Sequence, residues 1–379
     1  NDDEFQSVLI AGTVPAGEES MNYLAEQHGI EPVFIEAMSR ELSPKDVVSL
    51  FKILGEIRRQ RPDIIHTHTA KAGTVGRGAA LLYRWSTFGA RRVAVVHTFH
   101  GHVFHSYYGK LKTSIFITIE KLLARLATDK IVVISRQQFH EIHETYGVGR
   151  PAQFEIIPLG IDVDAFNDPG AKADGLRTEL GAQTDELLVG FVGRLTEIKD
   201  ISLYLHIAAQ IRDSAGADQP AMRFVIAGDG HLRKSLELQA AHLGLGESIV
   251  FLGNRSDTEA VYAGLDIVAL TSLNEGTPLS LIEAMAAGRP VISTMVGGVR
   301  DLLGNIDEPR DGFNVCERGI GVESRSPDDF KKGLIYLAKN ENVRKRLGDA
   351  GRSFVRSEYA KERLVKDIKQ LYRRLALER

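Results

Sequence analysis

The sequence predicts an α/β protein of two domains, each built on a parallel sheet flanked by helices. Short runs rich in β-branched residues alternate with stretches of helical period along nearly the whole chain. With 379 residues, the chain is also longer than one hydrophobic core usually serves. Hydrophobic residues make up 43% and charged residues 26%, a composition that is ordinary for a globular protein and excludes a disordered chain.

The first domain is expected over residues 1–166. Its strands are predicted at Ser7–Ala11, Pro32–Glu36, Asp63–His66, Val93–Thr98, Lys130–Ser135 and Phe154–Pro158. Between the second and third strands, apolar residues recur at helical spacing from Val47 to Ile57, after the start signal Ser43-Pro44. This pattern predicts an amphipathic helix that packs on the sheet.

A polar, glycine-containing stretch from Asn167 to Glu186 marks the expected boundary between the domains. The second domain is expected over residues 167–355 and is again Rossmann-like. Its strands are predicted at Leu187–Val192, Met222–Ala227, Ser248–Leu252, Asp266–Thr271 and Pro290–Thr294. An amphipathic helix in residues 356–379 is expected to pack back on the first domain.

Composition and charge limit the partners of this protein. The formal net charge of −3 gives no reason to expect nucleic acid, which calls for a basic face. Cys316 is the only cysteine, so the chain can form neither an internal disulfide nor a cysteine-based metal site. Because the sequence has neither a run of about 18 apolar residues nor a leader pattern, we expect a cytoplasmic protein, free or at the inner face of the cell membrane.

The most informative segment lies between the predicted strand Asp266–Thr271 and a helix that is expected to end near Gly288. Thr277 is expected to cap this helix, and Pro278 to occupy its first turn. A helix start that follows a parallel strand offers unpaired N–H groups and a positive dipole end. The segment therefore predicts a phosphate-binding site.

Glu275 and Glu283 lie eight residues apart around this helix start. If both are helical, the spacing corresponds to about two turns, roughly 12 Å of rise, so the two carboxylates would flank the anion site. The alternative is that Glu275 caps the helix and that Glu283 is a solvated surface acid.

A glycine turn and two cations follow the first strand of the second domain, at Gly193, Arg194 and Lys199. A guanidinium and an ammonium together suit a diphosphate, and they would stabilise a departing nucleotide without a metal. The alternative is two exposed charges at a helix start.

Together these motifs resemble those of the retaining family 4 (group 1) glycosyltransferases, and the resemblance spans nearly the whole chain. Glu275 and Glu283 match the family's Glu-x7-Glu motif, and Gly193 to Lys199 match its Gly-Arg-Leu…Lys segment. The resemblance implies the GT-B fold, in which the parallel sheets of two Rossmann-like domains face a cleft. It also implies transfer of a hexose or N-acetylhexosamine from a nucleotide diphosphate sugar, with a UDP-sugar favoured and with neither a cofactor nor a metal required.

The resemblance further implies roles for individual residues. Glu283 would bind the ribose hydroxyls, Glu275 would lie against the donor sugar, and the two cations would bind the diphosphate. The donor-binding residues implied in this way are Gly193, Arg194, Lys199, Glu275, Gly276, Thr277, Pro278, Leu279 and Glu283. Glu275, Arg194 and Lys199 are implied to be catalytic, together with His100 of the first domain.

In the first domain, His100 matches a family His-Gly pair that touches the donor sugar, and His102 is the reserve candidate. The stretch Asp63–Gly73 resembles one in bacterial capsule, O-antigen and lipid-linked oligosaccharide transferases, which implies a glycan or polyprenyl-diphosphate-linked acceptor. Lys71 would meet the diphosphate of that acceptor, or else is an ordinary solvated lysine. The segment Ile157–Asp162 resembles the family's interdomain segment, with leucine in place of the usual asparagine.

The beginning of the chain departs from the family pattern. Family members open with a short strand and a glycine loop, whereas Ser7–Gly12 resembles their second strand. Either Gly12–Gly17 serves as the loop, or this sequence starts inside the first domain. If the first strand and loop are absent from the molecule itself, we expect an unstable sheet and weak activity.

Several other interpretations fit parts of the sequence. His66 and His68 share one face of a strand, as the ligands of a metal hydrolase can. A non-catalytic sugar-nucleotide-binding protein, or an epimerase or phosphorylase of the GT-B fold, would also carry these motifs. The stretch Thr113–Thr128 has an apolar face with basic residues around it, which suits a helix packed on its own sheet or one lying on an anionic membrane surface.

Overall fold

The computed structural model describes residues 3–13, 25, 29–38, 43–87, 93–100, 110–167, 170–214, 216 and 219–377. The chain forms two compact units. Unit 1 comprises Asn1–Ile157 and Ile368–Arg379, and unit 2 comprises Pro158–Asp367. The division therefore lies before Phe166, the last residue expected in the first domain.

The segment after Ile157 belongs to unit 2 because it pairs with a later part of that unit. Ile161 forms a parallel bridge with Ala360, and its amide donates to the carbonyl of Tyr359 at 2.7 Å. A Cβ on Gly160 would lie 2.8 Å from the Cβ of Leu364, so only glycine allows this close approach.

In its described residues, unit 1 contains a two-stranded and a four-stranded sheet, both parallel. The smaller sheet pairs β1 (Ile10–Gly12) with β2 (Val33–Ile35). The larger sheet has the order β3-β4-β5-β6, formed by Ile64–His68, Ala94–Phe99, Lys130–Val133 and Phe154–Ile156. Each strand predicted for the first domain overlaps an observed strand, with shifted boundaries.

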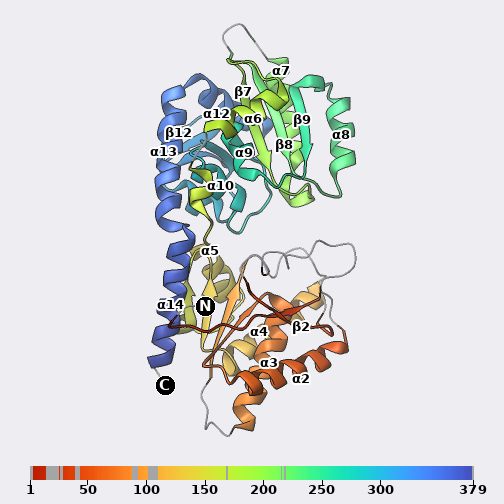
Figure 1. The fold of residues 1–379 in the computed structure, drawn as a ribbon. Helices are drawn as coiled ribbons and strands as arrows, with labels where there is room; N and C mark the ends of the chain where they lie inside the picture. The colour runs from red at the N-terminus through yellow and green to blue at the C-terminus, as the bar shows by residue number, and fades with distance from the viewer. Residues whose placement is uncertain are drawn as a thin grey trace. The chain divides into compact units, whose positions relative to one another are not determined.

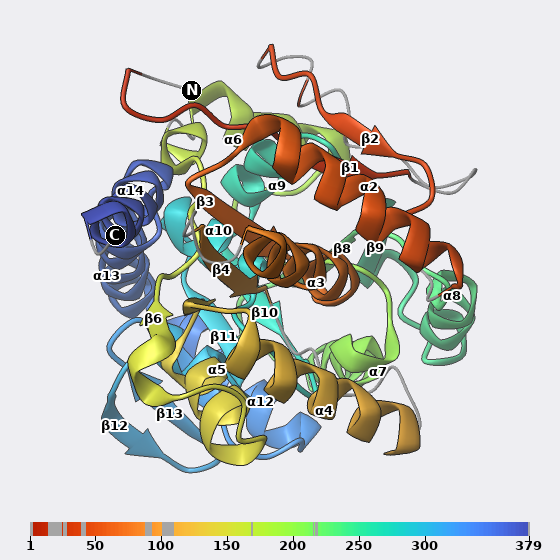
Figure 2. The ribbon, with the colours of Figure 1, turned by 90° about the horizontal axis from the view of Figure 1, so that it is seen from below.

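Three long helices lie side by side in unit 1, with α3 (Ala70–Ser86) between α2 (Lys45–Gln60) and α4 (Lys110–Leu126) (Figure 2). A short helix, α5 (Arg136–Phe139), follows β5. The helix expected from Val47 onward is α2, but its buried face is centred on Ile53, Leu54 and Ile57. Val47 and Phe51 are both 61% exposed, so the predicted apolar stripe is wider than the face that packs.

Unit 2 contains an eight-stranded sheet with the order β12-β13-β14-β11-β10-β7-β8-β9. The neighbouring strands β7, β8 and β9 are labelled in Figure 1. Five of its strands match the predicted ones and pair in parallel: β7 (Leu187–Val192), β8 (Met222–Ala227), β9 (Ile249–Gly253), β10 (Ile267–Leu270) and β11 (Val291–Thr294). The sheet continues beyond β11 into three strands that were not predicted, β14 (Gly319–Val322), which pairs with β11 in parallel, and then β13 (Phe313–Cys316) and β12 (Ile306–Arg310). β12 and β13 pair in an antiparallel manner, and β12 is exposed along its whole length and charged, so it lacks the apolar pattern of a core strand.

Helices in two packed groups flank this sheet. One group is α7 (Ile201–Asp213), α8 (Arg233–His242) and α12 (Pro327–Lys339), and the other is α9 (Thr258–Gly264), α10 (Leu279–Ala286) and α13 (Glu341–Glu358). Among the described residues, the buried side chains of unit 2 form one continuous core, whereas those of unit 1 form two smaller clusters. The last helix, α14 (Lys361–Leu377), begins in unit 2 and ends in unit 1, where Leu371 and Leu375 are buried.

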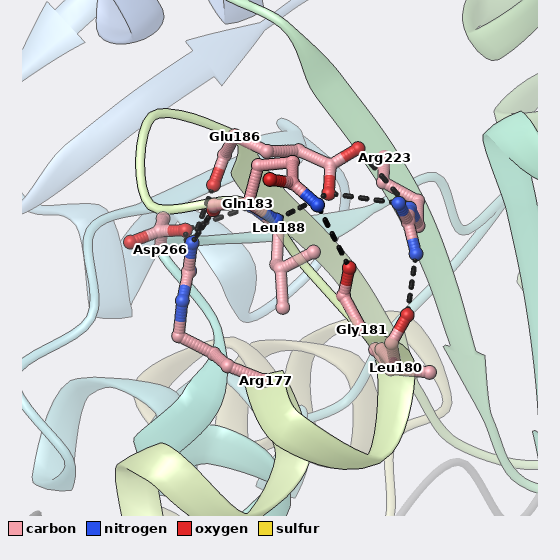
Figure 3. Close-up of polar contacts among 8 residues, drawn as sticks. All are labelled: Arg177, Leu180, Gly181, Gln183, Glu186, Leu188, Arg223 and Asp266. Atoms are coloured by element: carbon pink, nitrogen blue, oxygen red, sulfur yellow. Dashed lines mark hydrogen bonds and ion pairs between the residues drawn. The ribbon is translucent and has the colours of Figure 1, made fainter.

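The polar stretch read as a domain boundary instead contains a helix of unit 2, α6 (Gly170–Leu180). Figure 3 shows Arg177 on this helix donating from Nη1 to Asp266 at 2.9 Å, and from Nη2 to the carbonyl groups of Gln183 and Glu186. Asp266 also accepts from the amide of Leu188 at 2.7 Å. The polar side chains therefore fix α6 to the amino ends of β7 and β10, and these distant pairings leave no local signal in the sequence.

This network lies at the amino ends of the parallel strands. It is therefore on the opposite side of the sheet from the carboxyl ends of these strands. We expect Asp266→Ala to lower the free energy of unfolding by about 1.5–3 kcal/mol, since Asp266 accepts hydrogen bonds from a guanidinium and a backbone amide. Urea unfolding would measure this loss, with the exposed Asp185→Ala as the matched control. Nucleotide affinity should stay unchanged in both variants, and an equal loss of stability in the two would contradict the assignment.

Candidate functional site

The loops after β7 and β10 of unit 2 are joined by hydrogen bonds at the carboxyl ends of these strands. The hydroxyl of Thr271 donates to the carbonyl oxygens of Lys199 and Asp200, at 3.1 Å each. The amide of Leu273 donates to the carbonyl of Ile198 at 2.8 Å. Asp200 adopts a left-handed conformation with φ of 44°, which this pairing helps to hold. Crevices at the carboxyl ends of parallel strands are where α/β folds bind ligands.

The structure brings two of the predicted site residues, Lys199 and Glu275, into direct contact. The Nζ of Lys199 lies 2.6 Å from Oε1 of Glu275, and the hydroxyl of Ser272 donates to the same oxygen at 2.5 Å. The side chains of Lys199 and Glu275 are only 19% and 10% exposed. They therefore form a partly buried ion pair, and Lys199 is not the exposed charge of the alternative interpretation.

A glycine turn after β11 fixes the backbone of Glu275. The amide of Gly298 donates to the carbonyl of Glu275 at 3.0 Å. Gly297 has φ of 53°, and a Cβ at this position would lie 1.9 Å from the same carbonyl. Any residue other than glycine would move the loop that carries Glu275.

Arg194 follows a second close approach of backbone, between the loops after β7 and β8. Gly193 has φ of 153°, and a Cβ on Gly228 would lie 2.0 Å from the carbonyl oxygen of Gly193. The amide of Leu195 donates to the carbonyl of Asp229 at 2.9 Å. The Arg194 side chain itself is exposed, and no partner for it is found among the described residues. It is thus available to an anion.

The predicted cap of α10 is wrong. The helix begins at Leu279, its N-cap residue is Pro278, and no side chain caps it. The hydroxyl of Thr277 is buried and has no hydrogen-bond partner within the described ranges. Because the helix starts later than expected, Thr277 lies too early to cap it, and the first-turn amides of Leu279 and Ser280 keep no side-chain acceptor. Such amides attract phosphate.

The two-turn relationship between Glu275 and Glu283 is also wrong, because only Glu283 lies on the helix. Oε2 of Glu283 accepts a hydrogen bond of 2.9 Å from the hydroxyl of Tyr262, a fully buried residue of α9. Burial raises the pKa of Glu283, and the bond from Tyr262 opposes that shift. Glu283 is therefore a half-buried carboxylate rather than a solvated surface acid.

In unit 1, His100 follows β4 and lies in a row of imidazoles. Its Nε2 is 2.8 Å from Nδ1 of His68, whose ring stacks on that of His66 at 4.3 Å between centroids. His66 is held from both sides, by the hydroxyls of Tyr372 and Thr98 at 2.6 Å each. Burial, with the neighbouring imidazoles as the second cause, lowers the pKa of His66 to about 3 and that of His68 to about 4. Burial also lowers the pKa of His100. The row is therefore uncharged at neutral pH.

This arrangement bears on the metal-centre interpretation. Both ring nitrogens of His66 are hydrogen-bonded to hydroxyl groups, so neither nitrogen is directed at a position where His66 and His68 could bind one metal ion together. Across the part of the chain that the structure describes, no three His, Cys, Asp or Glu side chains are arranged to hold a metal ion.

The other two residues predicted for the acceptor side differ in outcome. Lys71 lies in the first turn of α3, where its Nζ pairs with Oδ1 of Asp46 at 2.7 Å and its side chain is 12% exposed. It is therefore not the solvated lysine of the alternative interpretation. His102 lies outside the described residues.

Comparison with known proteins agrees with this geometry. A family model described as Glycosyltransferase Family 4 matches residues 5–165, and one described as Glycosyl transferases group 1 matches residues 173–354. A UDP-Gal:alpha-D-GlcNAc-diphosphoundecaprenol alpha-1,3-galactosyltransferase of Escherichia coli is 30% identical in an alignment of 317 residues that covers 82% of this chain and 78% of that protein. The chain belongs to the group 1, family 4 glycosyltransferases.

Other known proteins align with a smaller part of the glycosyltransferase, or are similar to it in fold alone. A D-inositol 3-phosphate glycosyltransferase of Corynebacterium jeikeium is 31% identical over 229 residues, 58% of this chain and 52% of that one. Anabaena HepE in complex with UDP has a TM-score of 0.77 at 20% identity and covers 96% of this chain and 91% of its own. A sucrose-phosphate synthase from Thermosynechococcus elongatus has a TM-score of 0.72 at 23% identity, with 92% and 84% covered. These similarities show the GT-B fold for the glycosyltransferase.

Sequence reasoning missed several residues that hold predicted site residues of the glycosyltransferase in place, within each unit. Ser272 lies just after a predicted strand and close to Glu275, so its position gave a weak local signal. Tyr262 and Tyr372 gave none, because each contacts a partner far away in the sequence. In its described residues, the glycosyltransferase has no helix long and apolar enough to cross a bilayer.

Proposed function

We propose that this glycosyltransferase moves a hexose or N-acetylhexosamine, with retention, from a UDP-sugar to a glycan or polyprenyl-diphosphate-linked acceptor in bacterial surface polysaccharide synthesis. The observation that carries the proposal is the Lys199–Glu275 pair at the carboxyl ends of the unit 2 strands. Lys199 lies in the loop after β7, and Glu275 lies in the loop that leads to the uncapped start of α10. An ammonium, an available guanidinium at Arg194 and free helix amides suit a diphosphate.

These groups favour the departure of the nucleotide. As the bond between the anomeric carbon and the phosphate oxygen breaks, its electron pair stays on the diphosphate. The acceptor hydroxyl adds to the carbon and passes its proton to an oxygen of the departing diphosphate. Arg194, Lys199 and the amides at the start of α10 stabilise the growing negative charge, so the proposal needs neither a metal nor a cofactor. Glu275 and the neutral His100 orient the donor sugar, and Glu283 binds the ribose.

The acceptor class rests on the stretch Asp63–Gly73 and on the E. coli relative, whose name gives a sugar linked to diphosphoundecaprenol as its acceptor. Lys71 remains our candidate for the acceptor diphosphate. To meet it, the lysine would exchange its bond to Asp46 for one to a phosphate oxygen.

The direct test is transfer with the purified protein. It would be incubated with UDP-, GDP- and ADP-sugars and a short polyprenyl-diphosphate-linked sugar, with nucleotide release and product mass as the readouts. We expect a UDP-sugar to be used, and the anomeric configuration of the product to match that of the donor. Nucleotide binding without transfer or hydrolysis across the panel would instead favour a non-catalytic binding protein, and a rearranged or phosphorylated sugar would indicate an epimerase or phosphorylase.

The exposed face of helix α4 supports the proposal that the protein works at the membrane surface. Ile115, Leu122 and Leu126 are 52%, 56% and 46% exposed, and their seven- and four-residue spacings put them on one stripe. The exposed cations Lys121 and Arg125 lie beside the stripe. An apolar stripe flanked by cations suits the surface of an anionic bilayer, which is also where a lipid-linked acceptor lies.

We therefore expect the double substitution Leu122→Glu and Leu126→Glu to weaken binding to vesicles containing anionic lipid by roughly 100-fold, since two leucines lose their apolar contact. Flotation with anionic and with neutral vesicles would measure the effect. Leu238→Glu, a substitution of a leucine 63% exposed on α8 of unit 2, is the control and should bind as the unchanged protein does. Equal flotation of all three proteins would rule out docking through α4.

A further inference from the structure

We propose that Tyr262 is a positioning residue for Glu283, holding one carboxylate oxygen so that the other accepts hydrogen bonds from the two ribose hydroxyls of the donor nucleotide. The inference rests on the proposed function, because it assumes that Glu283 meets the ribose. It adds Tyr262, which lies outside the sequence motifs described above, to the residues that prepare the nucleotide site.

The geometry divides the two oxygens of Glu283 between two tasks. The hydroxyl of Tyr262 donates to Oε2 at 2.9 Å, whereas Oε1 has no hydrogen bond to any described residue. Tyr262 is 0% exposed, and its ring is in edge contact with that of Phe166, with 6.0 Å between centroids. The phenol is therefore fixed in place, and through this hydrogen bond it fixes the direction in which Oε1 points.

The bond also has a fixed direction. Burial, and after it the charge of Glu283, raises the pKa of Tyr262 well above its usual value, so the phenol keeps its proton at neutral pH and donates a hydrogen bond to the carboxylate. Burial raises the pKa of Glu283 as well, while the hydrogen bond from Tyr262 lowers it. Tyr262 thus both aims the carboxylate and helps to keep it ionised, which is the form that accepts hydrogen bonds from hydroxyl groups.

A second buried tyrosine in unit 2 provides the matched control. Tyr204 is also 0% exposed, but its hydroxyl donates to backbone carbonyls, that of Val189 at 2.7 Å and that of Val225 at 3.3 Å. Removing either hydroxyl leaves a buried acceptor without its donor, and both changes keep the ring. Only the change at position 262 alters a side chain that we place against the nucleotide.

The experiment compares the affinities of the unchanged protein, Tyr262→Phe, Tyr204→Phe and Glu283→Gln for UDP and for 2′,3′-dideoxy-UDP by calorimetry. We expect the unchanged protein to prefer UDP, and Tyr262→Phe to lose about 10-fold in affinity for UDP while its affinity for the dideoxy nucleotide stays the same. Tyr204→Phe should lower the melting temperature and leave the ratio of the two affinities unchanged.

The pH dependence supplies a readout that a purely structural tyrosine would not move. UDP affinity should fall as the pH drops through the pKa of Glu283, because the protonated group accepts fewer hydrogen bonds. In Tyr262→Phe this fall should occur at higher pH, since the bond that favoured the ionised form is gone. In Glu283→Gln the fall should disappear.

Two different failures are distinguishable. If the unchanged protein binds both nucleotides equally and Glu283→Gln has no effect, the ribose assignment fails and the inference fails with it. If ribose preference is present and depends on Glu283, yet Tyr262→Phe keeps both the preference and the pH profile, then Tyr262 only fills the core and the inference alone is overturned.

Discussion

Replacing Lys199 with alanine is expected to lower the rate of sugar transfer by about 10²–10³-fold, the loss typical of removing one preorganised group that stabilises developing negative charge. The structure places the ammonium 2.6 Å from Glu275, in a loop held by Thr271. The effect should appear in kcat more than in the affinity for UDP, because charge on the leaving diphosphate grows as the bond breaks. Steady-state kinetics of UDP release would measure it.

Removing Lys199 also leaves the carboxylate of Glu275 without its cation, so a second variant separates the two effects. In Lys199→Ala combined with Glu275→Gln, the uncompensated charge is gone but the contact to the diphosphate is still missing. We expect stability to recover and transfer to remain low. Lys234→Ala, a change to an exposed lysine on α8, is the control. Full turnover in Lys199→Ala would remove the lysine from the proposed mechanism.

Glu120→Ala is expected to cost about 3–5 kcal/mol of unfolding free energy, because it leaves a buried arginine without its partner. Arg77 of α3 is 0% exposed and donates from Nη2 to both carboxylate oxygens of Glu120 on α4, at 2.7 and 2.8 Å. Its Nε donates to the carbonyl of Gly73 at 3.0 Å. Urea unfolding, followed by a probe in unit 1, would report the loss.

Two controls test the physical reason. Glu323→Ala breaks the pair between Glu323 and Arg300, whose side chains are 50% and 52% exposed, and should cost about 0–1 kcal/mol. Arg77→Met combined with Glu120→Leu removes both buried charges and should be much more stable than Glu120→Ala alone. A double variant as unstable as the single one would mean that shape, and not the uncompensated charge, dominates at this position.

Features that depend on neighbouring residues were predictable from the sequence. The parallel strands of both units follow from local alternation between β-branched runs and helical periods, and each predicted strand overlaps an observed one. The glycine, arginine and lysine after β7 and the two glutamates around α10 stand at fixed spacings, and the family that they indicate is the one shown by the comparisons. The roles implied for these side chains remain predictions.

Features that depend on residues far apart were not predictable. The polar stretch after Asn167 resembled a domain boundary because its hydrogen bonds reach Asp266, far away in the sequence. β12 was not predicted, because an exposed edge strand needs no apolar face. The predicted start of α10 was wrong. Thr277 before Pro278 has the sequence pattern of a helix cap, but the pattern does not reveal whether the hydroxyl of Thr277 reaches a backbone amide of the helix.

The sequence by itself determined the fold class, the family and which residue types stand at the carboxyl ends of the strands, since period and spacing act over a few residues. Only the tertiary structure decided the pairs: Lys199 with Glu275, Tyr262 with Glu283, and His66 with Tyr372. A hydrogen bond forms wherever two groups meet in space, and their meeting depends on how whole strands and helices pack, which no short stretch of sequence encodes.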